Sequence, residues 1–312
     1  MASTVPLPWL PPWPPSAGSA RMTRGTPLAP TLQMVASALA FSVMGVCVKQ
    51  LEGRIPAAEV VLARALVSVV LSWGLLRRAG VDPWGQRRAL LLWRGVIGTL
   101  ALFCVYAALM ALPLASATVL QYLYPTFTAL LAWLALGEPI GRRVLLAMAV
   151  GWAGVLLVAQ PAPLFDGATP LQPLPVLIAV AGALATALAY VSVRSLGRTE
   201  HPLVIVFYFP LVAVPLSLPL VVLNPVLPTP TDVVWLAGVG VFTQLGQVSL
   251  TRGLTALPAA RATALSYVQV LFAGLWGWLL FAEGLDGWTI LGALLVLLAT
   301  LISLSARGAT GR

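Results

Sequence analysis

Apolar stretches of about 20 residues recur from residue 31 almost to the end of the chain, broken by Pro, Gly and charged residues. A helix of that length crosses about 30 Å of hydrocarbon. The stretches are continuously apolar, whereas a membrane barrel strand would alternate and be about half as long. The sequence therefore predicts an all-α integral membrane protein with ten transmembrane helices. We place them at approximately 31–50, 57–76, 92–111, 115–136, 143–160, 174–193, 202–223, 234–255, 260–281 and 286–305.

The composition excludes a soluble domain. Hydrophobic residues make up 60% of the chain and charged residues only 9%, against about 25% charged in soluble proteins. The net charge is +9, but the basic residues stand singly or in pairs between apolar runs, which favours lipid over nucleic acid as a partner. Cys47 and Cys104 fall inside apolar stretches, so we expect no disulfide framework, metal site or cofactor.

The distribution of basic residues predicts the orientation. With a cytoplasmic N-terminus, only Lys49 and Arg54 lie outside, and Arg64 lies inside the second span. The rest lie at the cytoplasmic side: Arg21, Arg24, Arg77, Arg78, Arg87, Arg88, Arg94, Arg142, Arg143, Arg194, Arg198, Arg252, Arg261, Arg307 and Arg312. This asymmetry favours cytoplasmic N- and C-termini in the inner membrane of a bacterium.

The first thirty residues differ from the rest because proline is dense in PLPWLPPWPPSAGS. This segment cannot form a helix and lacks the apolar core of a secretory signal. We expect residues 1–30 to be a disordered cytoplasmic tail, or in part an over-long start, since Met22 and Met34 could also initiate. A Pro-rich ligand for a partner protein is an alternative.

An internal repeat covers the rest of the chain. ALPLASATVLQYLYPTFTALLAWLALGE, from Ala111, aligns without a gap on ALPAARATALSYVQVLFAGLWGWLLFAE, from Ala256, an offset of 256 − 111 = 145. Five spans per copy is an odd number, so the second copy should be inverted in the membrane. Inverted repeats are typical of secondary transporters with alternating access. The expected parts are a first repeat (31–160), an outer linker (161–173), a second repeat (174–306) and a cytoplasmic tail (307–312).

These motifs carry a family resemblance. LPLASATVLQYLYPTFTALLAWLALGE, followed by VLLAMAVGWAGVLL, resembles the fourth and fifth spans of EamA-domain permeases, the ten-span branch of the drug/metabolite transporter superfamily. FSVMGVCVKQL, IPAAEVVLARALVS and LLWRGVIG match the opening pattern of that family. The resemblance covers nearly all of residues 31–306 and implies solute transport. It is strongest to the subgroup with bacterial S-adenosylmethionine uptake carriers and the G members of the nucleotide-sugar-carrier-related solute carriers. The second repeat departs from the pattern with Val270 in place of Pro125.

No predicted span carries an Asp, Glu or His near its middle. His201 falls in a cytoplasmic loop, and all nine carboxylates fall in loops or at helix ends. A proton relay usually needs an intramembrane Asp, Glu or His, so exchange or downhill export is the simpler expectation. The same absence counts against a metalloenzyme, a carboxylate-pair hydrolase and a membrane protease. We expect the protein not to be an enzyme.

Arg64 is the most informative single residue, because it lies about seven residues, or about 10 Å, into the second span. Facing lipid there would cost about 1–3 kcal/mol. It should therefore face an internal cavity, or else snorkel outward or bond to Glu59 or a helix-end carbonyl.

Polar side chains in other spans are the remaining candidates. Positions i, i+3, i+4 and i+7 share one helix face, and a mid-span proline frees a carbonyl that survives only inside the protein or at a wet cavity. In the fourth and ninth spans the candidates are Thr118, Gln121, Tyr122, Pro125, Ser266, Tyr267 and Gln269; Tyr124 points elsewhere and should pack. By the resemblance, Tyr106, Tyr190, Gln244 and Gln247 join them. Hydrogen bonding between helices is the alternative.

These candidates predict the solute. They offer one arginine, hydroxyls and amides but no acid, which favours a small metabolite bearing a carboxylate, such as an amino acid or organic acid. An uptake carrier for S-adenosylmethionine or a nucleoside is the alternative, because tyrosine faces can hold a sulfonium. A membrane enzyme, or a scaffold acting through the tail, is less expected. The predicted partners are the solute and membrane lipids, and a homodimer stays open.

Overall fold

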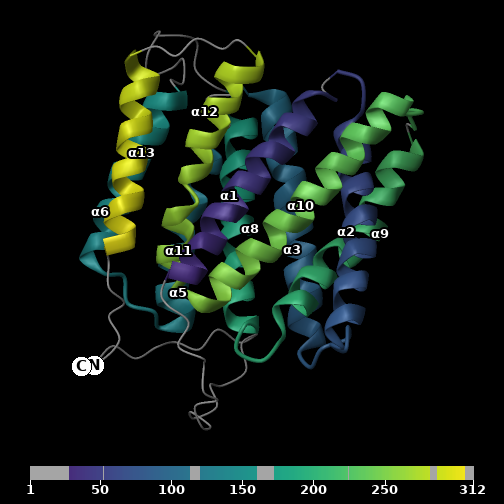
Figure 1. Cartoon of the computed structure of the whole chain (residues 1–312), viewed down its shortest axis with the longest axis horizontal. Helices are drawn as coiled ribbons and strands as arrows, with labels where there is room; N and C mark the ends of the chain where they lie inside the picture. The colour runs from purple at the N-terminus through teal and green to yellow at the C-terminus, as the bar shows by residue number, and fades with distance from the viewer. Residues whose placement is uncertain are drawn as a thin grey trace.

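The computed structural model describes residues 28–51, 53–112, 120–159, 172–223, 225–281 and 287–305. Thr118, residues 1–27 and 161–171 of the predicted N-terminal tail and linker, and the whole predicted tail 307–312 lie outside these ranges. All regular elements of the described part are helices (Figure 1). They are α1 (Leu28–Lys49), α2 (Ala57–Ala79), α3 (Arg88–Ala111), α5 (Tyr124–Leu136), α6 (Arg142–Ala159), α8 (Pro173–Leu196), α9 (Pro202–Leu223), α10 (Pro230–Ala256), α11 (Ala259–Leu265), α12 (Val268–Phe281) and α13 (Gly287–Ser305).

Several of these helices can span a membrane. Seven spans in the described ranges are long and apolar enough, one of them formed by α11 and α12 together. Two shorter apolar helices, Tyr124–Leu136 and Ile290–Ile302, accompany them. The predicted all-α membrane fold is therefore confirmed.

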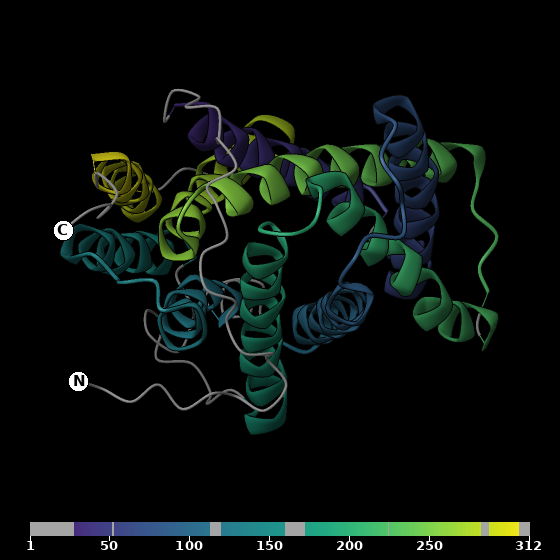
Figure 2. The ribbon, with the colours of Figure 1, turned by 90° about the horizontal axis from the view of Figure 1, so that it is seen from below.

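The helices pack in a pattern that repeats itself. α1 packs on α10 as α8 packs on α3, and α5 packs on α8 as α12 packs on α1. α2 contacts α10 as α9 contacts α3, while α6 pairs with α13 and α2 with α9. The neighbouring pairs α6–α13 in Figure 1 and α1–α10 in Figure 2 belong to this pattern. Exchanging each helix for its counterpart in the other repeat reproduces these contacts, so the sequence repeat is also a structural repeat.

The fourth and ninth spans are each interrupted, at positions that differ by one residue when the repeats are aligned. The chain turns at residues 122–123 before α5 and at 266–267 between α11 and α12. The amide of Leu123 donates to the carbonyl of Leu120 at 3.2 Å, and that of Ser266 to Thr263 at 3.1 Å, the tighter i to i+3 pattern of a 3₁₀ turn. Pro125 lies in the first turn of α5, where proline is favoured. The ninth span is interrupted with Val270 in its place, so proline is not required.

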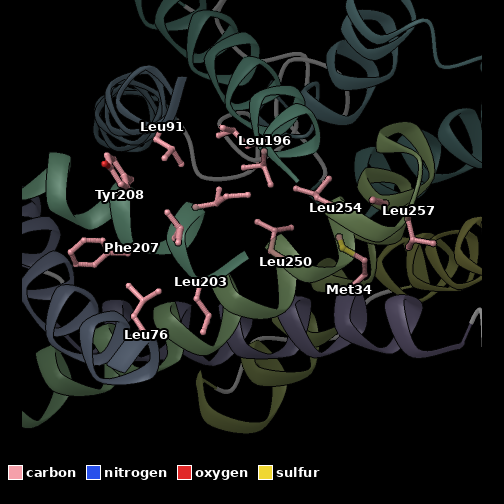
Figure 3. Packing of buried hydrophobic residues seen from close by; sticks show 14 of the residues in the cluster. Met34, Leu76, Leu91, Leu196, Leu203, Phe207, Tyr208, Leu250, Leu254 and Leu257 are labelled. Carbon is pink, nitrogen blue, oxygen red and sulfur yellow. The ribbon is translucent and has the colours of Figure 1, made fainter. Parts of the chain in front are cut away.

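One end of the bundle is filled by the largest cluster of buried apolar side chains (Figure 3). It gathers the beginnings of α1, α3 and α9 and the final turns of α2, α8 and α10. Its members include Met34, Leu76, Leu91, Leu196, Leu203, Phe207, Leu250 and Leu254. Contacts among buried apolar groups exclude water. We refer to the end of the bundle occupied by this cluster as the sealed end.

An ion pair joins the two repeats at the sealed end. Arg194 at the end of α8 donates from Nε to Glu138 Oε1 at 2.7 Å and from Nη1 to the carbonyl of Thr255 at 2.6 Å. Glu138, two residues beyond α5, also accepts from the amide of Ala259 at 2.8 Å. The Glu138–Arg194 pair thereby links the segment after α5 to the ends of α8 and α10 and to the beginning of α11.

Candidate solute cavity

A cavity of about 530 Å³ lies next to the sealed end, between the two repeats. Several helices contribute to both the cavity and the sealed end. In α1, Met34 lies at the sealed end and Phe41 lines the cavity; in α2, Leu76 lies at the sealed end and Arg64 lines the cavity. A cavity of this size can hold a small organic molecule. Its polar lining consists of Arg64, Arg94, Gln121, Tyr122, Tyr124, Thr186, Tyr190, Gln247 and Gln269.

Six of the predicted residues line this cavity: Arg64, Gln121, Tyr122, Tyr190, Gln247 and Gln269. Arg64 is only 6% exposed, and its guanidinium lies 5.7 Å from the centre of the Phe209 ring. It therefore does not snorkel to the surface. Glu59, the alternative partner, accepts from the amide of Val226 instead.

Other predicted residues lie close to the cavity but do not line it. Tyr106 lies beside the Arg64 guanidinium. Gln244 donates to Ser72 Oγ at 2.8 Å and faces a much smaller pocket between α2, α9 and α10. Tyr267 has no exposed surface and stacks on Tyr122, with ring centres 5.8 Å apart. Its place is between helices, because it also fills the space left by Gly151.

The two remaining predictions concern the interrupted spans. Pro125 is buried in the first turn of α5, and Ser266 is buried beside Tyr124 at the turn before α12. Neither lines the cavity, and the same holds for Tyr106, Gln244 and Tyr267. Tyr124 differs from the sequence-based expectation, which was packing away from the cavity. It lines the cavity and meets the ring of Tyr190 edge-on, with ring centres 5.4 Å apart.

Arg94 is a functional candidate that is absent from the predicted site residues. The sequence places it at the cytoplasmic end of the span predicted at 92–111. Because α3 begins earlier, at Arg88, Arg94 lies deeper in the helix, 3% exposed, at the cavity wall. Its guanidinium lies 4.3 Å from the centre of the Phe209 ring. A Cβ on Gly98, one turn later, would come within 3.0 Å of Nη1. An arginine followed one turn later by glycine in an apolar run was the available signal.

The hydrogen bonds of Arg94 are incomplete. Nη2 lies 3.5 Å from Gln247 Oε1, at the limit of a hydrogen bond. Nε and Nη1 are buried and have no hydrogen-bond partner in the described part of the chain. Buried polar groups are normally satisfied. The unsatisfied donors therefore point to a ligand or to water in the cavity.

No carboxylate of the described ranges pairs with either cavity arginine. Glu59 and Glu200 accept from backbone amides of other segments, Asp82 accepts from the amide of Trp84, Glu138 pairs with Arg194, and Asp232 with Arg54. A buried charge without a partner costs several kcal/mol. An anion that forms charge-assisted hydrogen bonds with the guanidiniums would offset that cost. The geometry therefore favours an anionic occupant.

The described residues contain no group of three or more His, Cys, Asp or Glu side chains that could hold a metal ion. The chemistry of the cavity walls is that of hydrogen bonding, aromatic contact and positive charge. Such walls can bind and release a solute.

Comparisons with known proteins agree with this picture. The sequence pattern of the EamA-like transporter family matches residues 29–160 and 173–305, which are the two repeats. The pseudopaline exporter CntI of Pseudomonas aeruginosa is 35% identical over 270 residues, covering 86% of this chain and 93% of that protein. Human solute carrier family 35 member G1 is 28% identical over 273 residues, covering 83% and 74%.

A solved crystal structure shares the fold. It superposes with a TM-score of 0.79 at 18% identity and covers 91% of this chain and 99% of its own. Both repeats match the family pattern, and the multi-pass helical bundle encloses a cavity between them. The chain belongs to the EamA-like transporter family and is a membrane transporter of a small-molecule solute.

Proposed function

We propose that the protein is a secondary transporter that carries a small organic anion across the bacterial inner membrane. The observation that carries this proposal is the pair of buried arginines, Arg64 and Arg94, which line the cavity without a carboxylate partner in the described part of the chain. A carboxylate-bearing metabolite, such as an amino acid or organic acid, supplies the missing charge.

Alternating access is the mechanism that the repeats support. Helices related by the repeat pack in equivalent pairs, which allows two related arrangements of the same contacts. With a cytoplasmic N-terminus, the sealed end is the cytoplasmic end, and the structure corresponds to a state closed on that side. The proposal includes ten membrane spans in all, with the second repeat inverted in the membrane relative to the first. Reporter tags at Arg142 and Asp286 should then lie on opposite sides of the membrane.

We propose that the protein exports its solute from the cell and that this transport is not coupled to protons through a relay of titratable side chains. One relative is named an exporter, of pseudopaline. The cavity wall carries no Asp, Glu or His among the described residues, so proton coupling through a buried acid has no group to act on. Exchange against another solute, or downhill export, needs no such group.

A second candidate solute is S-adenosylmethionine or a nucleoside. The observation that favours it is the aromatic wall formed by Tyr122, Tyr124 and Tyr190, which could hold a sulfonium or a base. Against it, both arginines would repel a cation. The two candidates therefore differ in their dependence on Arg64.

The test uses the purified protein in liposomes, screened by thermal shift and then by counterflow with labelled amino acids, organic acids, nucleosides and S-adenosylmethionine. We expect saturable counterflow of an anionic solute. Arg64→Ala should abolish that flux while membrane insertion stays normal. Flux restricted to S-adenosylmethionine and insensitive to Arg64→Ala would overturn the proposal.

A further inference from the structure

The two cavity arginines converge on one aromatic ring. Arg64 comes from α2 and Arg94 from α3, and both guanidiniums lie near the ring of Phe209 in α9. The guanidinium carbons lie 5.7 Å and 4.3 Å from the ring centre, so they are at most 5.7 + 4.3 = 10.0 Å apart. Two positive charges thus share one corner of a largely apolar cavity.

A single acidic group neutralises only one of the two charges. The two guanidiniums repel each other, and a solute with one carboxylate leaves a net positive charge in this corner even if that carboxylate contacts both arginines. Gln247 offers Arg94 only a long contact to a neutral amide oxygen, which does not neutralise charge. Both guanidiniums are at least nine-tenths buried, so water screens neither of them well.

We propose that the transported solute carries two acidic groups, one held by Arg64 and one by Arg94. This inference rests on the proposed transport of an organic anion and names its class. The planar guanidinium pairs with a carboxylate through two parallel hydrogen bonds. Each acid carbon then stands about 4 Å from its guanidinium carbon, so both pairs can form on one short molecule whose acids are separated by two to four carbons.

The rest of the polar lining indicates what the solute carries besides the two acids. Gln121 and Gln269 contribute amides, and Tyr122, Tyr124 and Tyr190 contribute aromatic rings and phenol groups. These neutral groups donate and accept hydrogen bonds. The cavity volume of about 530 Å³ exceeds that of a five-carbon diacid. The solute is therefore a dianion with an additional neutral polar portion.

The experiment compares diacids with their monoamides, which have nearly the same size and one charge fewer. Succinate, glutarate and adipate, and the monoamide of each, are measured by thermal shift and as competitors of counterflow in proteoliposomes. The wild-type protein should bind the best diacid at least about tenfold more tightly than its monoamide. In Arg94→Gln the diacid should lose that advantage and bind as the monoamide does. Arg94→Lys keeps the charge and should retain part of the preference.

A control variant tests whether the effect belongs to the cavity. Arg142 is exposed at the beginning of α6, so Arg142→Gln removes one positive charge outside the cavity and should leave the preference unchanged. Equal binding of diacid and monoamide by the wild type would overturn the two-acid inference while leaving anion transport intact. Binding of monocarboxylates but of no diacid would do the same. If the wild-type protein transported no anionic solute at all, the proposed function itself would be overturned.

Discussion

Two arginines in this protein sit in similar helices but have opposite surroundings. Arg194 at the sealed end donates to the Glu138 carboxylate and to the carbonyl of Thr255. Arg94 at the cavity lies over Phe209, with two nitrogens that have no partner in the described residues. The side chain of Arg194 is 18% exposed, whereas Arg94 is 3% exposed. The more deeply buried charge is the one without a counter-ion.

The difference separates a structural role from a binding role. Removing one member of a buried ion pair leaves the other charge uncompensated and destabilises the fold. Removing a charge that had no partner takes away a desolvation cost instead. Arg194 should therefore matter for stability and Arg94 for solute binding, and the two effects can be measured separately.

Between Arg94 and Arg194, the larger expected effect is the fall in transport in Arg94→Gln. The variant removes half of the positive charge facing the solute, so initial rates of counterflow should fall by about a hundredfold, equivalent to about 2.7 kcal/mol. Its melting temperature in detergent should stay equal to that of the wild type or rise, because an uncompensated charge is gone. A melting temperature several degrees lower would contradict the assignment of Arg94 to binding.

The paired arginine should show the reverse behaviour. Arg194→Gln and Glu138→Gln should each lower the free energy of unfolding by about 1–3 kcal/mol, a range that allows for partial exposure of the pair. The double variant should lose less than the sum of the two single losses, because the pair is coupled. Denaturation of all four proteins in the same detergent measures this cycle. Strict additivity would show that the ion pair contributes no stability.

Gly98 offers a smaller perturbation of Arg94. In Gly98→Ala the new Cβ would come within 3.0 Å of Arg94 Nη1 and 3.1 Å of the Phe209 ring, so the guanidinium must shift by a few tenths of an ångström. Counterflow should fall by about three- to tenfold while the protein folds. Gly45→Ala in α1 is the matched control, because its Cβ would meet no atom within 4 Å. Equal rates in both variants would show that the position of Arg94 is not critical.

The repeat explains how much of the fold was predictable. Its constant offset of 145 residues predicts two equivalent helical units, and the equivalent helix pairs of the described residues bear this out. The interruption of the ninth span was not predictable in the same way. Proline marks its counterpart in the fourth span, but Val270 gives no local signal. The turn at Ser266 and Tyr267 depends on packing in the second repeat, which a linear pattern does not reveal.

A site residue was predictable from the sequence only where its depth in a membrane span requires its side chain to face the protein interior. Arg64 lies far enough from either end of α2 to need an interior position. Arg94 is counted with the cytoplasmic arginines because it stands near the start of the span predicted at 92–111, but α3 begins at Arg88, which places Arg94 farther inside the helix. Tyr122 and Tyr267 occupy equivalent positions in the repeats, yet only Tyr122 lines the cavity. Tyr267 packs against Gly151 instead, a contact between distant parts of the chain that the local sequence does not reveal.

The smallest expected effect concerns a basic group in a loop. His201 lies between α8 and α9, and its Nδ1 accepts from the amide of Leu203 at 3.3 Å, in the manner of a helix cap. Partial burial and the positive charge of Arg252 lower the pKa of His201 below its usual 6.5. The neutral form is thus favoured in the folded state, and protonation at Nδ1 would remove the cap.

The lowered pKa of His201 predicts how the stability of the protein depends on pH. Above pH 6.5 the histidine is neutral in both states, and its contribution to stability is fully present. As the pH falls through the lowered pKa of the folded state, the unfolded chain has already taken up a proton, so that contribution is lost. Between pH 8 and pH 5 the wild type should therefore lose about one or two degrees more in melting temperature than His201→Asn, which keeps a capping oxygen but does not titrate. Parallel curves for the two proteins would show that His201 makes no titratable contribution, and Arg252→Gln, which removes the neighbouring charge, should reduce the difference between them.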